Sequence, residues 1–191
     1  MLKSTKYFAV IVLTGLFLFT SFSFAQDKKK PKVRVSPKAE VSQTIGLTEV
    51  SISYSRPGVK EREIWGGLVP YNKVWRTGAN EATKITFSTD VKINGKELKK
   101  GVYAFFAIPT KKEWTLIFNN VADQWGAFTY NEAKDALRIE TKPVSGNFSE
   151  WLYYSFTGMD VKKRGNTNSA IVSLNWGKLK VPFTVETVMK D

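Results

Sequence analysis

The sequence predicts an all-β protein, namely an antiparallel β-sandwich with one long ordered loop excursion; a small closed β-barrel is the alternative. Through most of residues 41–191, apolar side chains alternate with polar ones, which is the period of a half-buried strand. Roughly nine or ten such segments follow one another at the spacing typical of sandwiches and barrels. No long amphipathic helical pattern separates them, which argues against a parallel α/β sheet.

The first strands show the alternation most clearly. Residues 50–55 read Val-Ser-Ile-Ser-Tyr-Ser, and residues 84–88 continue with Lys-Ile-Thr-Phe-Ser. Residues 91–98 are predicted to form a hairpin, because Asn94-Gly95 is a residue pair that a type I′ turn favours. The turn places Ile93 opposite Lys96, Lys92 opposite Glu97 and Val91 opposite Leu98.

Residues 102–108 form a continuous apolar run that ends at Pro109. We expect a central strand that is covered on both faces, with residues 114–118 as its antiparallel neighbour. Further strands are predicted around residues 137–139 and over residues 151–156. Residues 131–136 are the only segment that we expect to form a short helical turn.

The C-terminal region predicts a closing hairpin. Residues 170–176 and 179–185 both alternate, and Gly177 stands between them. Pro182 has no N–H to donate to a neighbouring strand, so we expect the final strand to lie at a sheet edge.

Residues 1–25 are typical of a secretory signal peptide. Lys3 and Lys6 precede a charge-free run from Tyr7 to Phe24, and Ser23-Phe24-Ala25 places small residues where a signal peptidase cleaves. We expect cleavage between Ala25 and Gln26 and an exported protein, periplasmic or extracellular, that meets the membrane only through this peptide. An uncleaved membrane anchor is the alternative.

Residues 26–40 are predicted to be a basic flexible linker, and residues 41–191 a single domain. The linker holds six basic and two acidic side chains and two prolines, a composition that cannot form a core. A basic arm that touches anionic lipid or polysaccharide is the alternative interpretation of this segment.

The composition excludes several kinds of chemistry. The chain has 191 residues, a formal charge of +12, no His and no Cys. It therefore has no Ser-His-Asp triad, no imidazole base, no thiol nucleophile and no Cys or His metal site. We expect no metal and no cofactor, and no nucleic-acid partner for an exported chain.

Residues 56–83 interrupt the strand pattern. The segment is too long for an ordinary hairpin loop, and it is too rich in Ile, Leu, Val and Trp to remain disordered. We therefore predict an ordered excursion that packs over one end or face of the sandwich. Its polar and aromatic side chains are the candidate ligand-binding residues: Arg56, Arg62, Trp65, Tyr71, Trp75, Arg76, Asn80 and Glu81.

Three interpretations of this segment are open. In the first, Arg76, Asn80 and Glu81 form a buried hydrogen-bonded clamp that fixes the loop. In the second, Arg and Asn side chains face a groove lined by Trp65, Tyr71 and Trp75, which would suit a sugar or an organic acid. In the third, Glu63 and Glu81 act as the acid and base of a glycosidase-like hydrolase, although neighbouring arginines would lower a carboxylate pKa rather than raise it.

The same segment resembles a known protein family. The matching runs are Tyr54–Pro57, Ile64–Tyr71, Val74–Thr83, Gly101–Tyr103, Ile108-Pro109, Glu113–Thr115 and Trp125-Gly126. They are similar to the family catalogued as domain of unknown function 2911, over roughly residues 36–188. The resemblance implies a bacterial exported protein and supplies no catalytic residue. Glu61 stands where that family more often has a small residue such as Gly.

Four further tryptophans lie outside the excursion. Trp114, Trp151 and Trp176 fall at strand positions, where aromatic side chains usually belong to the core. Trp125 lies in a loop and is the best candidate for an exposed ring. Taken together, the sequence favours a ligand-binding or interaction module acting through residues 56–83, with a cofactor-free hydrolase and a structural envelope protein as the alternatives.

Overall fold

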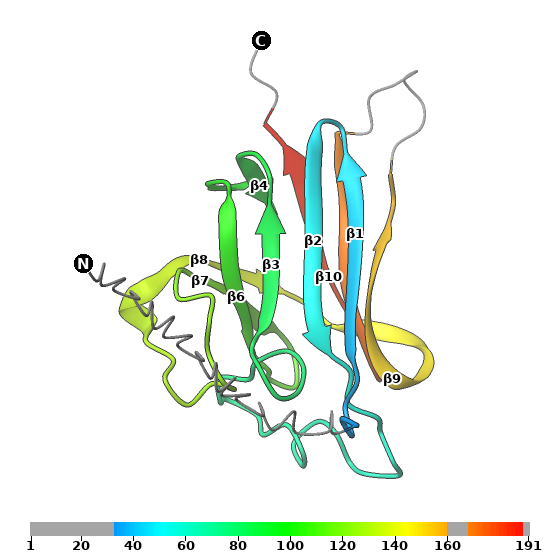
Figure 1. The fold of residues 1–191 in the computed structure, drawn as a ribbon. Coiled ribbons are helices and arrows are strands. Elements are labelled where there is room, and N and C mark those ends of the chain that lie inside the picture. Colours follow the sequence, from blue (N-terminus) through cyan, green and yellow to red (C-terminus); the bar gives the residue numbers. More distant parts are fainter. Residues whose placement is uncertain (1–32, 160–167, 189–191) are drawn as a thin grey trace, which may run out of the picture. The chain divides into compact units, whose positions relative to one another are not determined.

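The computed structural model describes residues 33–159 and 168–188, which form two antiparallel sheets (Figure 1). The predicted signal peptide and linker residues 26–32 lie outside the described residues. Among the residues described, no helix is long and apolar enough to cross a membrane. The elements are β1 (Lys38–Ile45), β2 (Thr48–Ser55), β3 (Thr83–Phe87), β4 (Val91–Ile93), β5 (Lys96–Leu98), β6 (Gly101–Ile108), β7 (Trp114–Asn119), the 3₁₀ helix η1 (Glu132–Lys134), β8 (Asp135–Thr141), β9 (Val144–Thr157) and β10 (Ser169–Thr187).

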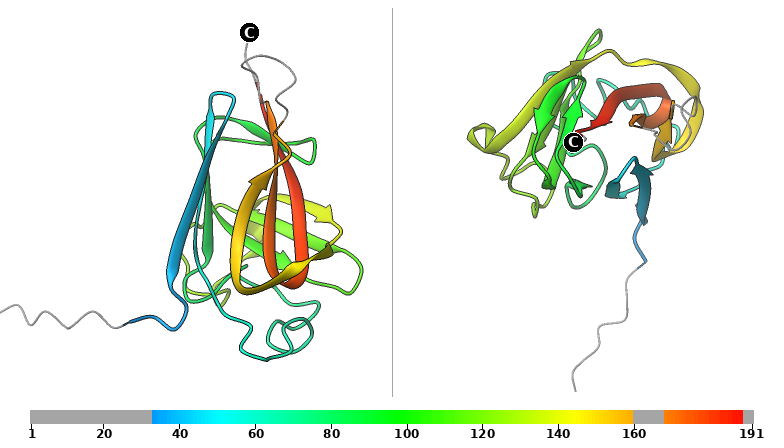
Figure 2. Two further views of the ribbon diagram at one scale, coloured as in Figure 1. Left: turned by 90° about the vertical axis from the view of Figure 1, so that its right-hand side faces the viewer. Right: turned by 90° about the horizontal axis from the view of Figure 1, so that it is seen from above.

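The two sheets confirm the predicted β-sandwich. One has six strands in the order β1-β2-β3-β6-β7-β8, and the other has four in the order β5-β4-β10-β9. Figure 2 shows the β1–β2 hairpin and the β9–β10 pair as separate layers. The strands do not form the closed barrel that was the alternative, because each sheet has two edge strands of its own.

Strand β6 is the central strand that its apolar run predicts. Its side chains from Tyr103 to Ala107 are all buried, although they point alternately to the two faces of the sheet. Phe105 packs in the main core between the sheets, where its ring lies 5.5 Å from that of Phe183. Phe106 belongs to a smaller cluster on the opposite face. β7 is its antiparallel neighbour, as expected.

The Asn94-Gly95 hairpin has the predicted register. Asn94 and Gly95 have φ angles of 47° and 79°, the two positive values that a type I′ turn requires. The Asn94 side chain also accepts a hydrogen bond from the Thr184 N–H at 2.8 Å, so the turn is fixed to β10. The observed pairs are Val91 with Leu98, Lys92 with Glu97 and Ile93 with Lys96.

The prediction of a C-terminal hairpin is wrong, because residues 169–187 form the single strand β10. Gly177, with a φ of 60°, creates a bulge at which the register with β9 shifts. The strand is internal rather than at an edge. Pro182 lies between the last pair with β9, at Lys180, and the first pair with β4, at Val185, so its missing N–H leaves no pair of the ladder unmade.

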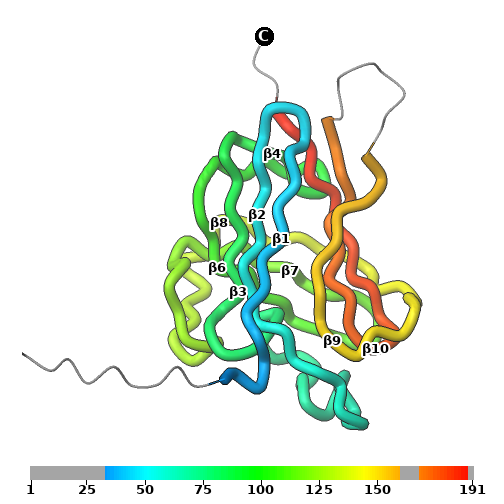
Figure 3. Tube along the Cα trace, turned by 45° about the vertical axis from the view of Figure 1, so that its right-hand side comes forward, coloured from blue at the N-terminus to red at the C-terminus, as the bar shows by residue number. Residues whose placement is uncertain are grey.

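The described part of the predicted linker also differs from expectation. Strand β1 begins at Lys38, and the carbonyl of Pro37 accepts a hydrogen bond from the Arg56 N–H at 2.9 Å. The chain thus enters the domain before residue 41, beside the start of the long excursion. Residues 56–82 lie at this end of the sandwich, at the bottom of Figures 1 and 3.

Candidate functional site

The excursion is anchored to the sandwich by aromatic packing. Four indole rings, those of Trp65, Trp75, Trp114 and Trp176, form one cluster with centroid separations from 4.7 to 6.3 Å. Trp75 also exchanges two backbone hydrogen bonds with Ala107 of β6, at 2.8 and 2.9 Å. Most of this aromatic surface is therefore core, and the rings of Trp75 and Trp176 also line a cavity that is described below.

Thr77 is the residue that clamps the excursion. Its φ of 51° is unusual for a β-branched side chain, and it is fully buried. Its hydroxyl donates to the Phe105 carbonyl at 2.8 Å. Its own carbonyl accepts from the hydroxyls of Tyr154, at 2.8 Å, and of Thr83, at 3.1 Å. These bonds are what hold a strained backbone in place.

Two of the predicted arginines serve the loop itself. Arg56 donates from Nε to the Leu152 carbonyl at 2.9 Å, which ties the excursion to β9. Arg62 donates to the carbonyls of Gly58, at 2.6 Å, and Val59, at 3.1 Å. These bonds close a turn whose central residues, Lys60 and Glu61, have φ angles of 49° and 58°, as in a type I′ turn.

Arg76 is different, because within the described residues its side chain forms no hydrogen bond or ion pair. Its Nε is buried without a partner, and burial lowers the pKa of the guanidinium. The side chain lines a cavity of about 290 Å³, named here the Arg76 cavity. The cavity is lined by Val35, Ser36, Pro57, Gly58, Lys60, Arg62, Leu68, Val69, Trp75, Arg76, Gly78, Ala79, Asn80 and Trp176.

The lining of the Arg76 cavity carries three cationic side chains, those of Lys60, Arg62 and Arg76, and no carboxylate. Asn80 also lines it, with its amide donating to the Ser36 carbonyl at 3.3 Å. Trp176 contributes an indole whose Nε1 is buried without a partner. The cavity therefore offers positive charge and hydrogen-bond donors to a small anion.

Glu81 does not pair with Arg76, so the clamp of Arg76, Asn80 and Glu81 is not formed. Its carboxylate accepts two hydrogen bonds from Arg34, at 2.7 and 2.8 Å, and lies 3.7 Å from Lys38. The hydrogen bonds from Arg34 lower the pKa of Glu81 to about 2. Such a carboxyl stays ionised and is a poor general acid.

The hypothesis of paired catalytic carboxylates gains no support. Glu63 is exposed and lines neither the Arg76 cavity nor the cavity beside Glu81. Tyr71, another candidate, also lines neither cavity; its ring lies over Gly66, where an added Cβ would come within 2.8 Å of it. The described residues include no group of three or more Asp and Glu that could hold a metal ion.

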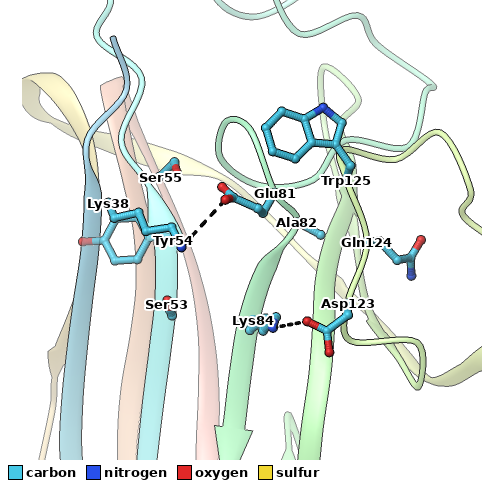
Figure 4. Close-up of a pocket in the computed structure, with 10 residues that line it drawn as sticks. All are labelled: Lys38, Ser53, Tyr54, Ser55, Glu81, Ala82, Lys84, Asp123, Gln124 and Trp125. Carbon is cyan, nitrogen blue, oxygen red and sulfur yellow. Dashed lines mark hydrogen bonds and ion pairs between the residues drawn. The ribbon is translucent and has the colours of Figure 1, made fainter. Parts of the chain in front are cut away.

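A second cavity, named here the Trp125 cavity, opens where β2 and β3 separate (Figure 4). Its volume is about 280 Å³. It brings together residues from four segments of the chain. Most of these residues were not among the candidates predicted from the sequence. The lining residues are Lys38, Ser53, Tyr54, Ser55, Glu81, Ala82, Lys84, Asp123, Gln124 and Trp125.

Comparison with known proteins supports the resemblance found in the sequence. No curated protein and no solved structure matches the chain. A family model described as a protein of unknown function, DUF2911, matches residues 36–185, from just before β1 almost to the end of β10. The chain belongs to the DUF2911 family.

Proposed function

We propose that this protein is an exported binding protein that holds a small oxyanion, such as the carboxylate of an organic acid, in the Arg76 cavity. One observation carries the proposal. Arg76 is a partly buried guanidinium with no counterion among the described residues. Burying a charge is costly unless it is paired, so a bound anion would stabilise this guanidinium.

The chemistry of the cavity favours an oxyanion in particular. A guanidinium presents its donors as a planar fork that matches a carboxylate or a phosphate with two parallel bonds. Lys60 and Arg62 add positive potential without a neighbouring carboxylate in the lining. The volume of about 290 Å³ lies at the lower end of ligand pockets, which span roughly 300–1,000 Å³, so the ligand should be small.

A titration of the purified protein tests this function. The panel is acetate, succinate, citrate and inorganic phosphate at constant ionic strength, followed by thermal denaturation and calorimetry. At least one of these anions should raise the melting temperature. The variant Arg76→Gln should bind that anion roughly tenfold or more weakly, because a charge-assisted hydrogen bond contributes about 1.5–3 kcal/mol.

The matched control is Lys112→Gln, which removes one positive charge from an exposed turn residue that lines neither cavity. It should bind the anion as the parent does. If no anion stabilises the protein, or if Arg76→Gln and Lys112→Gln behave alike, the proposal is wrong at this site, and a structural envelope role gains weight.

Export is supported by the pattern of residues 1–25, in which Lys3 and Lys6 precede a charge-free segment that ends in Ser23-Phe24-Ala25. Mass spectrometry of the protein isolated from its native cell should find Gln26 at the N-terminus. A chain that retains residues 1–25 would mean that the segment acts as an anchor instead.

A further inference from the structure

A separation between two strands creates the Trp125 cavity. β2 pairs with β3 from Val50 to Ser53, whereas its last two residues, Tyr54 and Ser55, pair only with β1. Beyond Ser53 the space that β3 would have occupied is bordered instead by the 81–82 segment and by the 123–125 loop. Figure 4 shows these residues facing one another across the opening.

The indole of Trp125 is exposed, and the backbone that carries it is fixed by hydrogen bonds. It is 59% exposed, but its backbone forms a bridge with Glu81. On either side of it, the Ala82 N–H donates to the Gln124 carbonyl and the Gly126 N–H to the Asn80 carbonyl, both at 3.0 Å. A single exposed aromatic is unremarkable; one whose backbone is fixed at the rim of a cavity offers a flat face on which a ligand can stack.

The charges in the cavity cancel. Lys38 lies 3.7 Å from Glu81, and Lys84 donates a hydrogen bond to Asp123, so the lining holds two cations and two anions (Figure 4). This balance contrasts with the cationic Arg76 cavity. A neutral ligand with many hydroxyl groups suits it best, because hydroxyls both donate to carboxylates and accept from ammonium groups.

Ser55 supplies an independent indication of a ligand. The residue is 98% buried and lines the cavity, yet its hydroxyl has no hydrogen-bond partner within the described residues. Buried polar groups are nearly always satisfied in native proteins, and an exception calls for an explanation. A hydroxyl-bearing ligand in the cavity would satisfy it.

We propose that the Trp125 cavity binds one ring of a neutral sugar, with the apolar face of the ring stacked on the Trp125 indole and its hydroxyls bonded to Glu81, Asp123 and Ser55. Aromatic side chains present a flat apolar face that suits the C–H face of a pyranose. With a volume of about 280 Å³, the cavity accommodates a single ring. Additional rings of a longer glycan would extend into solvent.

The test is calorimetric titration of the purified protein with glucose, galactose, mannose, N-acetylglucosamine, cellobiose and maltose. At least one sugar should bind and should shift the indole N–H resonance that disappears in Trp125→Ala. That variant should lose roughly tenfold in affinity. Phe128→Ala, which removes an exposed aromatic from the same loop but not from the cavity lining, should bind normally.

Ser55→Ala gives a second, sharper readout. Because the hydroxyl has no partner among the described residues, its removal should leave the denaturation midpoint unchanged or higher, while sugar affinity falls roughly fivefold. Affinity that is unchanged in both Trp125→Ala and Ser55→Ala would overturn the proposal, as would a panel in which no sugar binds at millimolar concentration.

The two cavities are tested separately. Arg76→Gln should leave sugar binding intact, and Trp125→Ala should leave anion binding intact. Sugar binding that is lost in Arg76→Gln but retained in Trp125→Ala would place the sugar in the other cavity and refute this inference, without bearing on whether anions bind there.

Discussion

The hydroxyl of Tyr154 in β9 donates a hydrogen bond of 2.8 Å to the carbonyl of Thr77 in the long excursion. The two residues are 77 positions apart in the sequence, and both are buried. Burial raises the pKa of Tyr154, so the phenol remains a donor at all physiological pH values. This bond joins the four-stranded sheet to the loop that forms both cavities.

Removing this donor should destabilise the protein moderately. Tyr154→Phe keeps the ring that packs 4.8 Å from Tyr54 and leaves the Thr77 carbonyl with its bond from Thr83. We expect a loss of about 1–2 kcal/mol in the free energy of unfolding by urea. Tyr153→Phe, on the exposed side of the same strand, should change it by less than about 0.5 kcal/mol. Equal effects would mean that the bond contributes nothing.

The hydroxyl of Thr77 should contribute more to the free energy of unfolding than the branched shape of its side chain. Thr77→Val keeps the branched side chain but leaves the buried Phe105 carbonyl without its 2.8 Å bond, so we expect a loss of about 1–3 kcal/mol. Thr77→Ser retains the hydroxyl donor, so its free energy of unfolding should fall by clearly less. Urea denaturation of the two variants compares these effects, and a larger loss for Ser than for Val would contradict the assignment.

The carboxyl group of Glu81 should make the stability of the protein depend on pH in the acidic range. The pKa of Glu81 is lowered to about 2 by its hydrogen bonds from Arg34, below the ordinary value near 4.5. Its contribution is therefore complete above the ordinary pKa and is lost as the pH falls towards 2. Between pH 6 and pH 2.5, the urea midpoint should fall more for the parent than for Glu81→Gln.

The control for this acid titration is Glu49→Gln, which removes an exposed carboxylate that forms no ion pair among the described residues. Its midpoint should follow that of the parent across the same pH range. High salt should reduce the difference between the parent and Glu81→Gln, because the Arg34–Glu81 pair lies at the surface. A midpoint for Glu81→Gln that falls as steeply as that of the parent would exclude this carboxylate as the source.

Glu61 occupies a backbone conformation that suits glycine. Its φ of 58° costs an L-residue about 1–2 kcal/mol, whereas glycine adopts it freely at an entropic cost of about 0.4–1 kcal/mol in the unfolded chain. Glu61→Gly should therefore stabilise the protein by up to about 1 kcal/mol. Glu63→Gly, at an exposed position without a positive φ, should do the opposite, and thermal denaturation decides between them.

The sequence was informative where the physics is local. The turn preference of Asn94-Gly95 determines the register of its hairpin, and the two-sided apolar run of residues 102–108 identifies a central strand. Gly177 shows the limit of such reasoning, because a positive φ serves a hairpin turn and a strand bulge equally well. Only the length of β9, which continues past the bulge as a partner, distinguishes the two.

The segment that carries the candidate site could be predicted from the sequence, but the roles of its individual side chains could not. Arg56, Arg62 and Arg76 look alike in the sequence, yet the first two donate to backbone carbonyls, and the third has no partner within the part of the chain that the structure describes. Which carbonyl lies within reach depends on the tertiary fold. The Trp125 cavity was beyond prediction for the same reason, because Ser55 and Trp125 are brought together only when the strands separate.

Gly177 also provides a test of how the bulge supports the excursion. An added Cβ at this position would lie 3.1 Å from Cδ1 of Ile64, in addition to the strain of a positive φ. Gly95 has a positive φ as well, but an added Cβ there would meet nothing within 4 Å. Gly95→Ala should therefore lower the free energy of unfolding by about 1 kcal/mol, which is the cost of backbone strain alone. Gly177→Ala should lower it further, and urea denaturation of both variants measures the difference.

The excess loss should disappear in a double-mutant cycle. Ile64→Val removes the methyl group that the new Cβ would meet, at a cost of about 0.5–1.5 kcal/mol by itself. If the steric contact is responsible, Gly177→Ala should be less harmful in the Ile64→Val background, whereas Gly95→Ala should be equally harmful in both. Additive effects at Gly177 and Ile64 would show instead that backbone strain in the bulge accounts for the whole loss.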